Sequence, residues 1–257
     1  MAGNPNSFIA KMASSDYQIG TTTDAGEENL LAIGLYAGAS EASGFRTTSV
    51  SLPINYVITV PNPSKPPYAF IFDLPIRYMD LEGGDVIDGS LGFGVRVPIL
   101  RRWAVTPMMR AGIVGSADAG VAQTVYSGMV TSKADFYFED LRLSVNNMVG
   151  YYTTDSVRIG DFHLDYDVEN VIFRNGLALE GSLNYQLFDD PTSWEVQFID
   201  TRVTGDPWFN DWYDEIVLTL GTRRRATRMT WQDLRIGASY TFGDNFDGFQ
   251  SVLNYRF

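Results

Sequence analysis

The sequence predicts an all-β fold, a transmembrane antiparallel β-barrel of about 12 strands with a short N-terminal helix in or under its lumen. Three observations support this prediction. Apolar and polar residues alternate with period two along nearly the whole chain, which is typical of strands with one apolar and one polar face. Only 19% of the residues are charged, against about a quarter in average soluble domains. No stretch approaches the roughly 18 consecutive apolar residues of a transmembrane helix.

The stretch 50–60 shows the alternation most clearly. Apolar and aromatic side chains fall on one face of it, and Ser51, Asn55 and Thr59 fall on the other. A soluble β-sandwich would give the same pattern with its apolar face turned inward. The runs are however about ten residues long, which is enough to cross a bilayer when the strand is tilted. They also carry aromatic residues near their ends, as the interface girdles of a membrane barrel do. We therefore expect the apolar face to contact lipid.

The runs predicted as strands are 29–38, 46–60, 69–80, 88–98, 103–113, 121–130, 138–152, 156–168, 177–188, 193–203, 214–224, 231–242 and 247–257. Their number is odd, whereas bacterial single-chain barrels have an even number of strands. With a periplasmic C-terminus and short periplasmic turns, the loop parity makes 114–137 one long outer loop and Thr153–Ser156 a periplasmic turn. We therefore exclude 121–130, the run with the weakest alternation, and expect twelve strands, with fourteen as the alternative.

The chain is expected to divide into residues 1–28, an N-terminal helix and linker, and residues 29–257, the barrel. Phe8, Ile9, Met12 and Ala13 have helical spacing and share one side. Residues 21–28 are polar and are expected to form a linker. The helix could plug the lumen, or it could be a tail outside it.

The polar faces of the predicted strands carry charges that should line the lumen. They comprise Asp73, Arg77, Arg96, Arg110, Arg142, Asp161, His163, Asp165, Glu180, Glu195, Arg235 and Arg256. Opposite charges in a narrow barrel usually pair. A channel would instead separate the two signs along its path. The sequence leaves both arrangements open.

Two polar features fall outside the lumen pattern. Asp200 and Arg202 lie on the apolar phase of their strand. They are expected beyond the bilayer, because a charge at the midplane of the lipid face costs about 2–4 kcal/mol. The aromatic and acidic stretch 206–213 is expected to be an outer loop, which either binds a sugar or a partner or folds onto the rim.

Composition and motifs argue against most enzyme and cofactor chemistry. The net charge of −12 opposes nucleic-acid binding, and the absence of cysteine excludes disulfides and thiolate sites. His163 is the only histidine, and no metal or cofactor site is expected. Asp161 and His163 share a strand face and resemble half of an omptin protease site. The acidic pair needed opposite them, Asp189-Asp190, is expected at the periplasmic end. We therefore expect no enzyme, with an omptin-like rim hydrolase as an alternative.

Leu253, Tyr255 and Phe257 lie in phase on the last predicted strand. This strand resembles the C-terminal insertion signal of outer-membrane barrels, which implies contact with the barrel-assembly machinery. A twelve-strand barrel behind a short helix also resembles the autotransporter β-domain, here nearest to barrels without a passenger. The resemblance implies a non-enzymatic pore or structural barrel, with a small-solute channel as the alternative. It also implies a monomer in contact with outer-membrane lipid and lipopolysaccharide. Residues 1–4 lack the features of a signal peptide, so we expect a mature sequence from the bacterial outer membrane.

Overall fold

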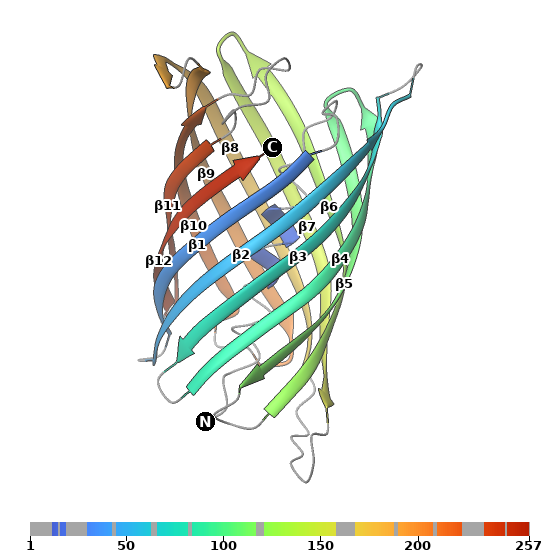
Figure 1. Ribbon diagram of the computed structural model, residues 1–257, viewed down its shortest axis with the longest axis vertical. Helices are drawn as coiled ribbons and strands as arrows, with labels where there is room; N and C mark the ends of the chain where they lie inside the picture. The colour runs from blue at the N-terminus through green and yellow to red at the C-terminus, as the bar shows by residue number, and fades with distance from the viewer. Residues whose placement is uncertain are drawn as a thin grey trace.

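A computed structural model describes the chain except for residues 1–11, 15, 19–29, 43–44, 63–65, 82–83, 117–120, 158–167, 188–189, 208–209, 223–233, 245 and 257. The described part contains a helical segment and a barrel of twelve strands (Figure 1). The strands are β1 (Leu30–Ala42), β2 (Phe45–Val60), β3 (Tyr68–Leu81), β4 (Gly84–Leu100), β5 (Trp103–Ser116), β6 (Val121–Phe138), β7 (Leu141–Val157), β8 (Glu169–Leu187), β9 (Asp190–Gly205), β10 (Trp212–Thr222), β11 (Leu234–Gly243) and β12 (Phe246–Arg256).

Each strand pairs antiparallel with the next one in sequence, and β1 closes the barrel by pairing with β12 from Ala32↔Arg256 to Ala42↔Phe246. Closure leaves no strand edge with unpaired backbone groups, which is what a sheet surrounded by hydrocarbon requires. Among the described residues, no helix has the length and apolar character needed to cross a bilayer.

The two ends of the barrel can be told apart by the last strand. We call the end at Arg256 the C-terminal rim, and the other end the opposite rim. β1 begins at the C-terminal rim because it runs antiparallel to β12. Successive strands then alternate in direction, so the connections after β2, β4, β6, β8 and β10 also lie at the C-terminal rim.

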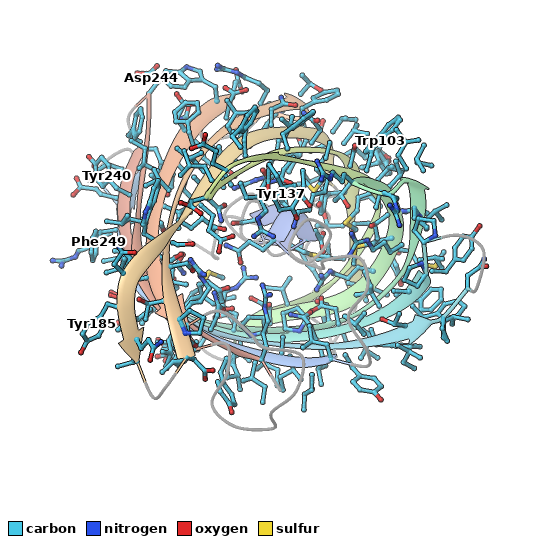
Figure 2. The ribbon with its side chains drawn as sticks, turned by 90° about the horizontal axis from the view of Figure 1, so that it is seen from above. Trp103, Tyr137, Tyr185, Tyr240, Asp244 and Phe249 are labelled. Carbon is cyan, nitrogen blue, oxygen red and sulfur yellow. The ribbon has the colours of Figure 1, made fainter. Side chains whose placement is uncertain are left out.

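The outer face of the wall is apolar over most of its area. Many large hydrophobic side chains on it are more than a third exposed, such as Leu91 at 68% and Leu177 at 52%. In the view along the barrel axis, Trp103, Tyr185, Tyr240 and Phe249 lie outside the ring of strands, whereas Tyr137 points inward (Figure 2). The inward positions are mostly buried and hold many polar and charged side chains. An apolar exterior around a polar interior is the arrangement of a membrane-spanning barrel, so both the fold class and the phase of the alternation agree with the sequence prediction.

The predicted outer loop 114–137 is wrong. Residues 121–138 form β6, which pairs with β5 from Trp103↔Ala134 to Ser116↔Val121 and also pairs with β7. Its alternation is weak for a physical reason. The inward side chains of Val125 and Met129 are apolar and buried, and the outward side chains of Tyr126 and Val130 are also apolar. The two faces of this part of β6 therefore do not differ in polarity.

Two other boundaries also differ from the prediction. Thr153–Ser156, expected as a turn, belongs to β7. The expected strand 156–168 falls almost wholly on residues 158–167, outside the described part. The count of twelve is therefore right, although the run excluded to reach it is wrong. The N-terminal helical residues are 12–14 and 16–18, so the helix continues past the expected end at Ala13.

Leu91→Arg should test whether the apolar face of the strands points outward, toward lipid. Leu91 is 68% exposed on the outer face of β4, and an arginine in hydrocarbon should lower the free energy of unfolding by about 2–4 kcal/mol. The measurement is urea unfolding of the protein in lipid vesicles. Gln197→Arg is the matched control, because Gln197 faces the interior cavity. Equal losses from the two variants would contradict the outward orientation.

Candidate functional site

The described helical residues lie inside the barrel at about the middle of its height (Figure 1). Met12, Ala13, Asp16 and Tyr17 are 0–1% exposed. Met12, Ala13 and Tyr17 share one cluster of buried residues with apolar side chains that the wall turns inward, including Val125, Met129, Met148, Ile172 and Val203. The wall therefore presents an apolar seat for the helix in the midst of an otherwise polar interior.

Arg110 on β5 connects the helix to the wall. Its guanidinium forms ion pairs with Asp16 of the helix and with Asp73 of β3. Arg110 Nη1 also donates a hydrogen bond to Ser90 Oγ at 2.9 Å. The hydroxyl of Tyr152 on β7 donates a hydrogen bond to Asp16 Oδ2 at 2.9 Å. Side chains from β5 and β7 thus contact the helix carboxylate directly, and side chains from β3 and β4 contact Arg110 in turn.

Gly92 explains how Asp73 and Arg110 meet across β4. Gly92 is the register partner of both residues. A Cβ on Gly92 would stand 3.3 Å from Asp73 Cβ and 3.6 Å from Arg110 Cζ. The missing side chain leaves the space through which the two charged groups reach each other.

Arg174 of β8 forms a second anchor. It is 0% exposed, and its Nη2 lies 3.0 Å from Glu215 Oε2 of β10 while its Nη1 donates to Tyr213 Oη at 3.1 Å. The guanidinium carbon also lies 5.2 Å from the ring centroid of Tyr17 and 5.7 Å from that of Tyr213. A cation over aromatic faces in a desolvated site is attractive, so Arg174 holds Tyr17 without needing a carboxylate from the helix.

The hydroxyl of Tyr17 lies directly against Gly176. A Cβ at Gly176 would overlap Tyr17 Oη, and it would lie 3.1 Å from Tyr17 Cζ. The helix can therefore take its present position only because residue 176 has no side chain.

A cavity of about 420 Å³ opens between the helix and the C-terminal rim. Tyr17 and Gln18 of the helix line one end of it, and rim residues such as Asp140 and Arg256 line the other. Charges of both signs face it. Arg142 Nη2 pairs with Glu180 Oε2 at 2.5 Å, and Arg235 donates to Ser193 Oγ and Thr219 Oγ1. The acidic Glu180, Glu195 and Glu215 come from the neighbouring strands β8, β9 and β10, and the basic Arg235 and Arg256 come from β11 and β12.

The interior charges named from sequence fall into three groups. Asp73, Arg77, Arg96 and Arg110 are buried inside the barrel, where Arg77 Nε lies 3.7 Å from Asp88 Oδ2. A second group lines the cavity: Arg142, Glu180, Glu195, Arg235 and Arg256. A third group lies outside the described residues: Asp161, His163 and Asp165.

Sequence reasoning missed much of the helix contact. Asp16 lies between the expected helix and the expected linker. Arg174 lies before the expected strand 177–188, although β8 begins at Glu169. Tyr17, Tyr152 and Tyr213 carry no signal that separates them from girdle tyrosines, apart from their inward phase on their elements.

The predicted Asp161-His163 pair belongs to the connection between β7 and β8, outside the described residues. Val157 ends β7 and Glu169 begins β8 at the opposite rim, whereas Asp190 begins β9 at the C-terminal rim. No group of three or more histidine or acidic side chains in the described part is arranged to hold a metal ion.

The described residues of the 206–211 loop fold onto the opposite rim. Glu169 N donates to Asp206 Oδ2 at 2.7 Å, and Val203 N donates to Asp211 O at 2.9 Å. Asn210 is 5% exposed and packs against the position of Gly243. Trp208 and Phe209 lie outside the described residues.

Arg110→Met should strongly destabilise the barrel. The substitution leaves Asp16 and Asp73 buried without their cation, and breaking a buried pair in this way costs about 3–5 kcal/mol. Urea unfolding in vesicles measures the loss. Arg102→Gln is the control, because Arg102 is exposed in the turn between β4 and β5 at the C-terminal rim and the contacts of an exposed charge contribute about 0–1 kcal/mol. A loss below about 1 kcal/mol for Arg110→Met would contradict the central role of this cluster.

Neither a family model nor a curated protein matches the sequence. Solved structures match along nearly the whole chain. The β-domain of the Bordetella autotransporter BrkA has a TM-score of 0.72 at 13% identity, covering 90% of this chain and 99% of that one. The translocator domain of the autotransporter NalP from Neisseria meningitidis has a TM-score of 0.64 at 10% identity, covering 98% and 97%. The COG4313 outer membrane channel from Pseudomonas putida F1 has a TM-score of 0.58 at 10% identity, covering 93% and 97%.

At these identities the likeness concerns the fold. Closed barrels of autotransporters and an outer membrane channel share it with this chain. The chain therefore has the fold of an autotransporter-like outer-membrane β-barrel, with helical residues anchored in its lumen.

Proposed function

We propose that this protein is a non-enzymatic barrel of the bacterial outer membrane, of the translocator type, whose lumen is held closed by its own N-terminal segment. The observation that carries the proposal is the buried ion pair between Asp16 and Arg110, with Tyr152 bonded to the same carboxylate. A carboxylate with two buried partners from the wall fixes the segment at a defined position. A tail that merely drifts into the lumen would have no such partners.

The direction of the chain supports a translocator. Tyr17 and Gln18 face the cavity that leads to the C-terminal rim, and Leu30 begins β1 at that rim. The described helical residues thus lie inside the pore, and β1 begins at the end that bears the C-terminus. This is the arrangement expected when the chain that precedes a barrel passes through its pore. The C-terminal rim is then the periplasmic end, and Leu253, Tyr255 and Phe257 serve as the signal for the barrel-assembly machinery.

A small-solute channel is the second candidate, and the cavity favours it. The space of about 420 Å³ has a polar, charged wall, and a barrel of this strand number is wide enough for a small channel once the helix is absent. The two candidates differ in one property. The translocator is closed in its resting state, whereas a constitutive channel conducts with the segment in place.

Removal of residues 1–28 should separate the two candidates. In planar lipid bilayers, the intact chain should show little conductance and the shortened chain should show large, steady openings. The expected rise follows from loss of the helix that fills the middle of the lumen. Steady openings of the intact chain, unchanged by the deletion, would support the constitutive channel instead.

Gly176→Ala should open the pore without deleting anything. The added Cβ would overlap Tyr17 Oη, so the helix must shift from its seat and conductance should rise. The double variant Gly176→Ala with Tyr17→Phe should return toward the closed behaviour, because the overlapping oxygen is gone. Gly128→Ala is the control, since nothing lies within 4 Å of its Cβ position. Failure of the Tyr17→Phe rescue, with normal folding, would show that Gly176 does not act through the helix.

A further inference from the structure

The outer wall carries a band of polar side chains on four neighbouring strands. Asn147 of β7, Asn175 of β8, Asp200 of β9 and Asp214 of β10 all point outward, and each is the register partner of the next. We call these four residues the polar stripe. Because strands tilt in a barrel, a row of register partners runs obliquely over the wall. Asn147 lies near the middle of β7, and Asp214 lies close to the opposite rim.

The members of the polar stripe contact one another only in part. Asn147 Nδ2 donates to Asn175 Oδ1 at 2.8 Å. Arg202 Nη2 lies 2.6 Å from Asp200 Oδ1, and its guanidinium carbon lies 5.4 Å from the ring centroid of Trp212. Asp214 Oδ1 accepts no hydrogen bond from any described residue. Each amide has two donors and an acceptor, so the single bond between Asn147 and Asn175 leaves most of their capacity unused.

The opposite part of the wall shows that this polarity is local. The central outward positions of β2–β5 hold large apolar side chains, among them Leu52, Phe72, Leu74, Leu91 and Met109. Lipid acyl chains pack well against these apolar side chains, but they form no hydrogen bonds with amides or carboxylates. Polar side chains within membrane segments usually meet a partner that hydrogen-bonds with them. The side of the wall formed by β7–β10 therefore has the chemistry of a protein contact.

We propose that the polar stripe is the interface through which a second copy of this chain docks in the plane of the membrane. A two-fold contact brings the same surface together from both copies, so the surface must complement itself. The polar stripe does this, because amides are both donors and acceptors. Arg202 of one copy can also reach the carboxylates of the other, and so give a donor to Asp214 Oδ1, which accepts no hydrogen bond from the described residues of its own copy. The proposal replaces the monomer expected from the sequence, and it does not depend on whether the lumen is sealed.

The absence of cysteine from the chain permits a direct test by cross-linking. Single cysteines are introduced beside the polar stripe, at Val149, Leu177 and Phe198, and on the other side of the barrel, at Leu52, Ile76 and Leu91; all six side chains are exposed outward. Each variant is placed in phosphatidylcholine vesicles and treated with a short bismaleimide. We expect dimers from at least one variant of the first set and none from the second. Equal yields from both sets, or none from the first, would overturn the proposal.

A second variant separates a protein contact from a lipid bridge. The triple substitution Asn147→Leu, Asn175→Leu and Asp214→Leu removes the polar groups and suits hydrocarbon, so the barrel should still fold and keep its unfolding midpoint. When this triple substitution is combined with Leu177→Cys, the yield of cross-linked dimer should fall at least tenfold. Undiminished cross-linking would contradict the proposal. Cross-linking that appears only when lipopolysaccharide is added would assign the polar stripe to lipid.

Discussion

The guanidinium of Arg110 determines how the interior of this barrel is organised. It is buried at 3% exposure, where an unpaired charge would be very costly. It is compensated by one carboxylate of the wall and one of the helix. The contact therefore joins two parts of the molecule that the chain alone does not hold together, the closed sheet and the segment before it. The position of the helix and the shape of the remaining cavity depend on this cluster, and so does the closure of the lumen that we propose.

The helix depends on the wall for its own stability. The described helical residues, 12–14 and 16–18, are too few to form a stable helix alone in water, and their order comes from the apolar seat and from contacts with Arg110, Tyr152 and Arg174. The wall has adapted to this role at several points. It turns Val125 and Met129 inward where a water-filled pore would need polar side chains.

The sequence predicts the fold well where one face of a strand meets lipid and the other meets polar groups. β2, β3, β4 and β11 satisfy this condition, and their runs were placed within a few residues. β6 does not, because its inward face packs against the helix and becomes apolar as well. Weak alternation favours a loop from sequence alone, whereas in the structure it reflects inward apolar side chains that share a buried cluster with the helix. For the same reason Asp16 could not be assigned, since only the folded barrel brings Arg110 and Tyr152 to it.

The ion pairs of the wall explain how a fixed plug can also be a removable one. The wall contains the pairs Arg110–Asp73, Arg77–Asp88, Arg174–Glu215 and Arg142–Glu180, in which each cation has a carboxylate from another strand. Asp16 is added to a set that is already balanced. If the helix leaves, no cation of these pairs loses its last partner, and Asp16 gains water. The barrel thus stabilises the helix strongly, but its own charge balance does not require the helix. The pore that we propose to be sealed by the helix needs this asymmetry if the barrel is to keep its structure when the helix leaves.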